Sequence, residues 1–395
     1  MVEVRNYPFN EAVELRPDPT ALELQEREPV SQVRLPYGGD AWLVTRHADV
    51  KTVLGDPRFS RAATLELGAD LPRAFPLHRT ESNILTMDPP DHTRLRKLVA
   101  KGFTARRTEL LRARAQEIVD DLLDAMEEQG PPADVVEALA LPLPITIICE
   151  MLGVPVADRD RFRAWSDAAM SITAFTPEEV LAAARSLREY IAGLVEDKRA
   201  NPGDDVLTDL VTAHDGGGPL TATEVVTFGV TLLAAGHETT ANQIANFTHT
   251  LLANPDRMAE LRADPALVPR AVEELLRFTP LGGSAGFPRI ATEDVELSGV
   301  TVPRGAAVFV DIPSGNRDPE VFERPHEIDF HRAANPHVAF GHGVHHCVGA
   351  QLARVELQVA VGTLLARFPG LEPAGEAVFK RGRLVRGPQS LPVRW

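Results

Sequence analysis

One segment near the middle of the chain has helical periodicity over an unusual length, and it limits the possible folds more than any other feature. Thr221 and Glu224 form a capping box just before an apolar run, and Asn254-Pro255 ends that run. The helix between them is expected to have about 30 residues and a length of about 45 Å. A helix of this length crosses a whole domain.

Most of the remaining chain is also predicted to be helical. Apolar residues recur with a period near 3.6 residues in four further segments, 108–128, 178–198, 267–278 and 350–368. Strand patterns occur in a hairpin at 29–44, at 287–310 and at 384–395. Helices and strands do not alternate, so a parallel doubly wound sheet is not expected. The sequence predicts a mainly α protein, with a single large helical domain over 1–395 and a small, segregated antiparallel β region.

Composition and charge exclude several classes of protein. Apolar residues make up 44% of the chain and charged residues 25%, which is typical of soluble globular proteins. The longest apolar runs, 141–149 and 228–236, are much shorter than the roughly 20 residues of a membrane-spanning helix. The 41 basic and 56 acidic residues give a net charge of -15, which disfavours nucleic acid as a partner. The N-terminal residues carry neither a signal nor a transit pattern, so a cytoplasmic location is expected.

One local stretch is basic despite the acidic balance of the whole chain. Between Arg94 and Arg107 the sequence RLRKLVAKGFTARR contains six basic residues and no acid. This stretch is either a solvated helix face or a docking patch for an acidic protein partner.

Cys347 lies in a glycine-rich stretch, FGHGVHHCVGAQL. Gly341, Gly343 and Gly349 would let the backbone approach a flat or bulky group closely. A helix is predicted to begin just after Cys347, and the positive end of a helix dipole favours the thiolate form of cysteine. We therefore expect an anionic sulfur at this position.

The same stretch is rich in histidine, so a metal site is an alternative. Six of the twelve histidines fall between His326 and His346. A zinc site could use His342, His345, His346 and Cys347, although adjacent histidines in a glycine-rich loop lack the paired spacing of zinc ligands.

Two more motifs place charged side chains in predicted helices. In the long central helix, AAGHETT brings a glycine, Glu238 and two threonines into an apolar surface and would permit a local opening of the helix. A buried acid is costly unless it has a use such as moving protons, but a close helix crossing would also need small residues. Glu274 and Arg277 are three residues apart and can form an ion pair, which on an exposed face would contribute little.

These motifs together resemble those of the cytochromes P450, the haem-thiolate monooxygenases, and specifically their soluble bacterial type. The cysteine stretch fits the haem loop FxxGx[HR]xCxG through Phe340, Gly343, His345, Cys347 and Gly349. Residues 235–240 fit the oxygen-activation segment [AG]Gx[DE]T[TS], and 274–277 fit ExxR. Three motifs in the right order over essentially the whole chain make the resemblance specific. It implies the cytochrome P450 fold.

The resemblance also implies roles for individual residues. Cys347 would be the thiolate ligand of the iron of haem b, and Phe340 would help to shield the sulfur. The haem propionates would be bound by His92, Arg96, Arg289 and His345. Glu238 would relay protons, and Thr239 would hold the oxygen under activation by hydrogen bonding. Arg332 would join Glu274 and Arg277 in a network that holds the cysteine loop.

The substrate and partners follow from the same resemblance. The pocket would include Leu232, Ala235, Leu281, Ser284, Phe287, Leu384 and Val385. Small residues at 281–287 suggest space for a bulky substrate such as a macrolide or another secondary metabolite, which would be hydroxylated or epoxidised. Electrons would come from NAD(P)H through a ferredoxin reductase and an acidic ferredoxin. Three alternatives remain: a haem-binding or sensing protein without turnover, a P450 that couples peptide or aromatic substrates oxidatively, and a zinc-dependent hydrolase.

Overall fold

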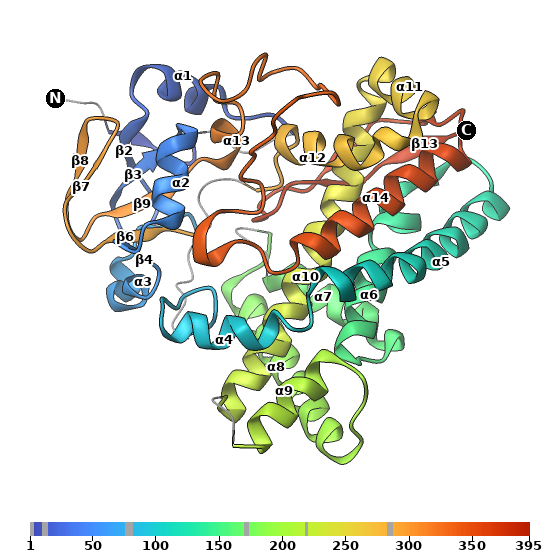
Figure 1. The fold of residues 1–395 in the computed structure, drawn as a ribbon, viewed down its shortest axis with the longest axis horizontal. Coiled ribbons are helices and arrows are strands. Elements are labelled where there is room, and N and C mark those ends of the chain that lie inside the picture. Colours follow the sequence, from blue (N-terminus) through green and yellow to red (C-terminus); the bar gives the residue numbers. More distant parts are fainter. Residues whose placement is uncertain (1–3, 10–14, 76–81, 170–173, 218–219, 283–286) are drawn as a thin grey trace. The chain divides into compact units, whose positions relative to one another are not determined.

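The computed structural model describes residues 4–9, 15–75, 82–169, 174–217, 220–282 and 287–395 (Figure 1). The chain divides into two compact units. The first unit consists of Met1–Thr93 and Glu273–Cys347, and the second of Arg94–Val272 and Val348–Trp395. The single domain expected over 1–395 stays a prediction.

The first unit contains most of the β structure. Its strands are β1 (Arg5–Asn6), β2 (Val30–Arg34), β3 (Asp40–Val44), β4 (Phe59–Ser60), β6 (Arg289–Ala291), β7 (Val295–Leu297), β8 (Val300–Val302) and β9 (Ala307–Val310). Its helices are α1 (Pro19–Arg27), α2 (His47–Gly55), α3 (Ala63–Leu67) and α13 (Ile312–Gly315). Two helices cross the division between the units, α4 (Asp91–Val99) and α12 (Val268–Phe278).

Six of these strands form one sheet in the order β1-β2-β3-β9-β6-β4. The hairpin predicted at 29–44 is confirmed, because β2 and β3 pair antiparallel with Val30 opposite Val44. The sheet is mixed, however, because β1 pairs parallel with β2 and β3 pairs parallel with β9. The β region predicted to be antiparallel therefore also contains two parallel pairs. Strands that a short turn does not connect are free to pair in either direction.

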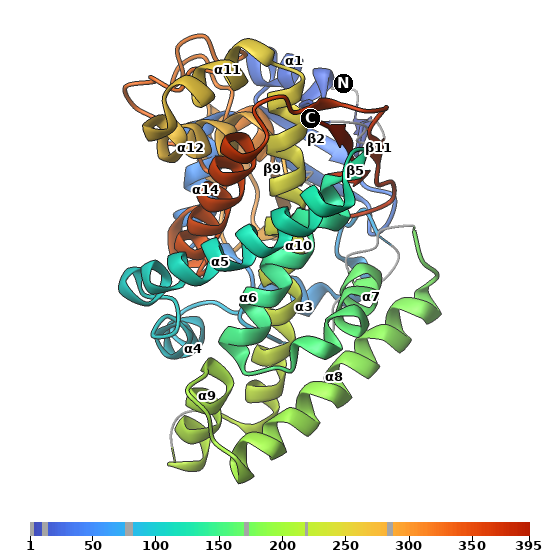
Figure 2. The same ribbon diagram turned by 90° about the vertical axis from the view of Figure 1, so that its right-hand side faces the viewer.

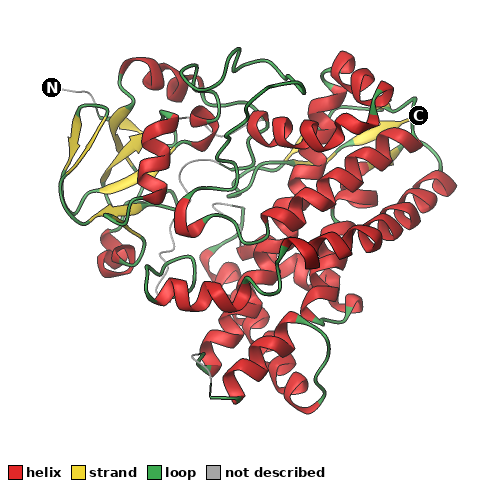
Figure 3. Cartoon of the chain, in the orientation of Figure 1, coloured by secondary structure: helices red, strands yellow, loops and turns green. Residues whose placement is uncertain are grey.

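The second unit is mainly helical (Figure 3). Its helices are α5 (Ala105–Gln129), α6 (Pro142–Leu152), α7 (Arg159–Ala169), α8 (Pro177–Ala200), α9 (Val206–Asp215), α10 (Ala222–Leu252), α11 (Pro255–Ala263) and α14 (Ala350–Arg367). Short strands complete it: β5 (Ala133–Asp134), β10 (Glu372–Pro373), β11 (Val378–Phe379), β12 (Pro388–Ser390) and β13 (Pro392–Arg394). The mainly α fold class with small separate sheets is confirmed.

The long helix α10 is the centre of this unit, and it packs against α6, α8, α9 and α14 (Figure 2). Its capping box of Thr221 and Glu224 is formed as the sequence predicts. The helix α10 is α-helical over Ala222–Leu252, including the AAGHETT segment that would permit a local opening. A Cβ atom on Gly236 would lie 2.8 Å from the Ile148 side chain of α6, so this glycine serves a close helix crossing.

None of the described helices has both the length and the apolarity needed to cross a membrane.

Candidate active site

The cysteine loop is a compact turn in the first unit. Residues Gly343–His345 form a 3-10 turn, and the backbone N–H of Cys347 donates to the Phe340 carbonyl at 2.9 Å. Cys347 is exposed, and α14 begins three residues after it at Ala350. The loop therefore holds the position of Cys347 through its own backbone while leaving the side chain accessible to a ligand.

One glycine of the loop, Gly343, is packed closely against another segment of the protein. Gly341 and Gly343 have positive φ values of 75° and 71°, a region that favours glycine. A Cβ atom on Gly343 would lie 2.6 Å from the Leu54 carbonyl oxygen and 2.7 Å from the Gly55 Cα. The close approach at Gly343 is thus to the end of α2, a segment of the protein itself.

Each of the three histidines of the loop contacts a different part of the protein. The ring of His345 packs on that of His92 with 4.3 Å between centroids, and His346 lies beside Phe340 at 6.3 Å. His342 lies against Gly55. Within the described ranges, no three His, Cys, Asp or Glu side chains are placed to share a metal ion.

Four cationic or basic side chains are crowded together next to this loop. Arg61, His92 and Arg289 are buried, and the ring of His345 lies on that of His92. Burial, followed by the charges of His92, Arg289 and Arg61, lowers the pKa of His345 to about 3, and Asp88 opposes this shift. Burial also lowers the pKa of Arg289 to about 10. Buried positive charges of this kind are stabilised by counter-charges.

An anionic group would compensate this cluster. The Nε2 atom of His345 is buried and has no hydrogen-bond partner in the part of the chain that the structure describes. Arg61 is held in place by the carbonyls of Leu85 and Pro288, at 2.8 and 2.6 Å. Carboxylates such as haem propionates fit these residues, since charge-assisted hydrogen bonds would offset the cost of burying both partners. Arg61 is not among the residues for which the sequence motifs imply propionate binding.

Arg96 was predicted to belong to the same group. It follows His92 by four residues on α4, and residues with this spacing share a helix face.

The predicted Glu274–Arg277 pair is buried rather than exposed. The side chains are 1% and 0% accessible, and the guanidinium of Arg277 forms two hydrogen bonds with the carboxylate, at 2.6 and 2.9 Å. Arg332 and Asn335 also donate to Glu274, each at 3.2 Å. The geometry brings together all three residues of the predicted network.

Arg277 extends this network to the segment that precedes the cysteine loop. Its guanidinium donates to the carbonyls of Asn316, Pro325 and Glu327 at 2.8 to 3.0 Å. The charged cluster therefore fixes the path of the chain from 316 to 335. A buried pair of this kind is strongly destabilising when one partner alone is removed.

The acid of the central helix lies in the second unit and has a lysine partner. Glu238 is 2% exposed, and its Oε1 atom accepts hydrogen bonds from Lys380 Nζ at 3.0 Å and Asn242 Nδ2 at 2.8 Å. Burial alone would raise the pKa of Glu238, but the charges of Lys380 and His237 and these hydrogen bonds lower it below its usual value. Sequence reasoning missed Lys380, which stands 142 residues from Glu238 and belongs to no motif.

Thr239 occupies a different face of α10. It is half-buried, and its hydroxyl donates to the Ala235 carbonyl at 2.9 Å. Ala235 is exposed and lies one turn earlier on the same face. The hydroxyl is therefore near the surface of the helix, whereas Glu238 is enclosed.

The predicted substrate residues are found in both units. In the first unit, Leu281 is half-buried, and Phe287 is exposed with the Arg61 guanidinium 5.2 Å from its ring centroid. Ser284 lies outside the described residues. In the second unit, Leu232 is on α10, and Leu384 and Val385 are on the loop between β11 and β12.

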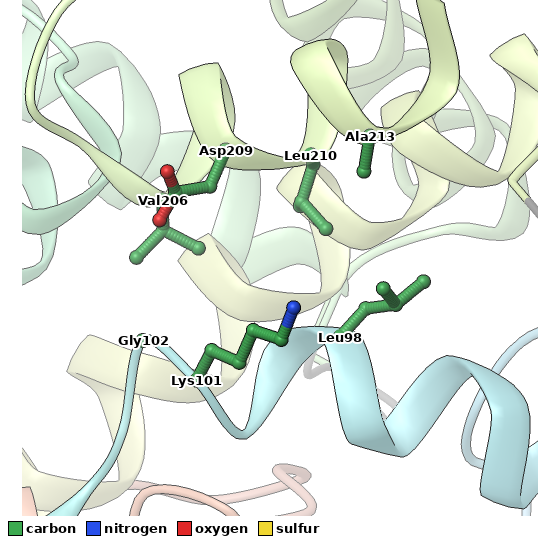
Figure 4. Close-up of a pocket in the computed structure, with 7 residues that line it drawn as sticks. All are labelled: Leu98, Lys101, Gly102, Val206, Asp209, Leu210 and Ala213. Atoms are coloured by element: carbon green, nitrogen blue, oxygen red, sulfur yellow. The ribbon is translucent and has the colours of Figure 1, made fainter. Parts of the chain in front are cut away.

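A small cavity of about 160 Å³ lies elsewhere in the second unit, between the end of α4 and α9 (Figure 4). It is lined by Leu98, Lys101, Gly102, Val206, Asp209, Leu210 and Ala213. It is smaller than the roughly 300–1,000 Å³ typical of ligand pockets, and its lining includes none of the predicted substrate residues. This cavity is not a candidate for the active site.

The basic segment 94–107 is partly neutralised. Arg94 pairs with Glu224 at 2.7 Å, and Arg107 lies 3.3 Å from Asp209. Lys97, Lys101 and Arg106 are exposed. A smaller patch is therefore available to an acidic partner than the sequence alone suggests.

Comparisons with known proteins identify the family. The Cytochrome P450 family model matches residues 29–382. Nocardicin C N-oxygenase of Nocardia uniformis subsp. tsuyamanensis is 51% identical, and Mycinamicin IV hydroxylase/epoxidase of Micromonospora griseorubida is 48% identical; each match covers 100% of this chain and 99% of the relative. The crystal structure of HinD with NMFT and NO is similar with a TM-score of 0.95 at 48% identity, covering 100% of both chains.

The chain belongs to the cytochrome P450 family. It is a P450 monooxygenase, as the resemblance of its sequence motifs predicted.

Proposed function

We propose that this monooxygenase binds haem b through Cys347 and inserts oxygen into a bulky, largely apolar small molecule, a macrolide or another secondary metabolite, by hydroxylation or epoxidation. The observation that carries the proposal is the group of basic side chains beside the exposed Cys347: Arg61, His92 and Arg289 are buried, and the His345 ring packs on that of His92 with its Nε2 atom buried. The negative charge of an anionic cofactor would complement this cluster. When bound, the haem supplies the activation of dioxygen at its iron.

Most of the residues that would bind and orient this cofactor belong to the first unit. Cys347 would provide the thiolate ligand. The Nε2 atom of His345, the guanidinium of Arg289 and the side chain of His92 would bind propionate oxygens, and Arg96, which follows His92 on α4, would contribute as well. The network around Glu274 keeps the cysteine loop in one conformation, because it fixes the preceding segment through carbonyl hydrogen bonds.

The residues of α10 move and hold protons. Glu238 can take up a proton at Oε2, which is buried and has no hydrogen-bond partner within the described part of the chain. Thr239 can hold the oxygen under activation through its hydroxyl, which must first give up its bond to the Ala235 carbonyl. Glu238 and the Thr239 hydroxyl would together deliver protons during oxygen activation, with Glu238 as the positioned general acid.

The substrate part of the proposal draws on the relatives and on the predicted pocket. By name, one relative oxygenates nitrogen in nocardicin C and another hydroxylates and epoxidises mycinamicin IV. These names support a secondary-metabolite substrate, but they differ in the bond attacked. The predicted pocket residues Leu232, Ala235, Leu384 and Val385 are apolar, which favours an apolar substrate.

Electron supply is the last part of the proposal. Electrons would be supplied from NAD(P)H through a ferredoxin reductase and an acidic ferredoxin, which would dock on Lys97, Lys101 and Arg106. A cytoplasmic location belongs to the same proposal. Charge complementarity of this kind speeds association and is weakened by salt.

The visible spectrum of the reduced, carbon monoxide-treated protein tests the cofactor assignment. Wild type and Cys149→Ala, which changes a buried cysteine, should give the thiolate-type Soret band, and Cys347→Ala should lose it. A colourless protein that carries zinc, or an imidazole-type spectrum in fresh wild type, would refute the assignment. Titration with macrolides should then produce a low-to-high spin shift, and product formation with ferredoxin, reductase and NADPH would exclude a sensor without turnover.

A further inference from the structure

The loop between β11 and β12, residues 380–387, is held against a polar stripe of α10. The stripe consists of Glu238, Asn242 and Asn246, which are four residues apart and so share one helix face. Lys380 reaches Glu238 at the start of the loop. Near its end, Asn246 donates to the Arg386 carbonyl at 3.1 Å, and a Cβ atom on Gly387 would overlap the Asn242 side chain. The loop is therefore fixed to α10 at both ends.

The middle of the same loop reaches α7 and the segment that follows it. The Arg383 guanidinium donates to the Asp167 carbonyl oxygen and lies 4.0 Å from the carboxylate of that residue. It also lies 4.8 Å from the ring centroid of Phe175. The loop thus connects α7 with the acid of α10.

Two acids and several cations meet in this region. Burial and the charge of Glu238 raise the pKa of Asp167, and Lys380, Arg383 and Arg163 oppose the rise. Around Glu238 itself, the charged or titratable neighbours are His237, Lys380 and, more distantly, Asp167 and Arg163. Lys380 is the cation in direct contact with the carboxylate.

This contact distinguishes the two oxygens of Glu238. Oε1 accepts from both Lys380 and Asn242, whereas Oε2 is buried and has no partner among the described residues. The side chains of Glu238 and Lys380 are 3% and 14% exposed. A carboxylate this well buried needs its counter-charge and takes up a proton when that charge is removed.

We propose that Lys380 is a positioning residue for proton delivery: it holds Glu238 as a carboxylate through Oε1, so that Oε2 is the oxygen that takes and gives the proton. The proposal rests on the proposed function only in naming Glu238 as the proton donor. The same loop carries the predicted substrate residues Leu384 and Val385, four and five positions after Lys380. Movement of this loop on substrate binding would therefore change the hold on Glu238.

Infrared spectroscopy of the haem-loaded protein tests the hold on Glu238 without turnover. At neutral pH, Lys380→Met should show one protonated carboxylic acid band more than wild type, and this additional band should disappear in the Lys380→Met/Glu238→Gln double variant. Lys380→Arg, which restores a cation, should resemble wild type. Arg304→Met removes an equal charge from an exposed turn and should leave the spectrum unchanged. An unchanged spectrum in Lys380→Met would overturn the proposal.

Turnover gives a second measurement. Coupled product formation in Lys380→Met should fall about tenfold, which is less than the whole contribution of a positioned acid. More peroxide should form per NADPH, and the acid limb of the pH profile should shift to higher pH. Lys380→Arg should recover most of the coupling. If Lys380→Met does not fold, Lys380→Gln, which keeps a donor without the charge, takes its place with the same expectations.

The two proposals can fail separately. If wild type lacks the thiolate-type spectrum, the proposed function fails, and the infrared band still decides whether Lys380 keeps Glu238 ionised. If the spectrum is of the thiolate type but neither Lys380→Met nor Lys380→Gln changes the band or the coupling, the role of Lys380 alone is refuted.

Discussion

Replacing Glu356 by glutamine should change how the stability of this P450 depends on pH. Glu356 lies on α14 and is 1% exposed. Its Oε2 atom is buried and has no hydrogen-bond partner in the described ranges. Burial raises the pKa of this carboxyl to about 8, and the hydrogen bond with Thr240 opposes the rise only in part. Glu356 is therefore protonated in the folded protein at neutral pH.

The sign and size of the effect follow from the difference between the folded and unfolded chains. The unfolded carboxyl titrates near its ordinary pKa of 4.5, so between that pH and about 8 folding takes up a proton. The stability that this group contributes is complete below the unfolded pKa, and about 1.4 kcal/mol is lost for each pH unit until the folded carboxyl ionises near 8. Glutamine does not titrate. The unfolding free energy of Glu356→Gln relative to wild type should therefore increase by about 4 kcal/mol from about pH 5 to about pH 8.

Urea-induced unfolding of the haem-loaded protein, followed by far-UV circular dichroism at several pH values, measures this difference. The change with pH is the test, because a constant offset also contains the cost of burying the glutamine N–H groups. Glu376 is exposed, so Glu376→Gln is a matched control and should follow the wild-type dependence. If Glu356→Gln follows it as well, Glu356 is ionised or hydrated in the folded protein, and the reasoning from its burial is wrong.

Three further predictions concern the candidate site. Thr239→Ala should raise the peroxide formed per NADPH, because it removes the hydroxyl that we propose to hold oxygen during its activation; unchanged coupling on a bound substrate would assign the role to another group. Glu274→Gln should destabilise the protein by about 3–5 kcal/mol, since it leaves buried arginines without their counter-charge, and should lower the haem content of purified protein; a normal unfolding curve would contradict this. Arg289→Leu should speed haem transfer to apomyoglobin, and an unchanged transfer rate would remove Arg289 from the propionate site.

The main helices could be predicted because their signals are local. The capping box at Thr221 and Glu224 marks the start of α10, which was predicted to end before Asn254-Pro255 and spans Ala222–Leu252. The segment predicted at 178–198 is α8, Pro177–Ala200, with Thr176 as its cap. In each case the residues that form the cap stand within four positions of one another, so the sequence contains the whole interaction.

The sheet could be predicted only in part. A short turn between neighbouring segments of the sequence joins β2 and β3, and this hairpin was predicted correctly. The parallel pairing of β3 with β9 joins segments more than 250 residues apart, and no local pattern specifies the direction of such a pair.

The sequence by itself determined the positions of the main helices and the motifs that identify the family, including the loop around Cys347. Only the tertiary structure decided which charges are buried together. Lys380 reaches Glu238 from 142 residues away, and the Glu274–Arg277 pair is enclosed with Arg332 instead of facing solvent. The physical reason is that helix formation depends on neighbours within about four residues, whereas the free energy of a buried charge depends on partners supplied by distant segments.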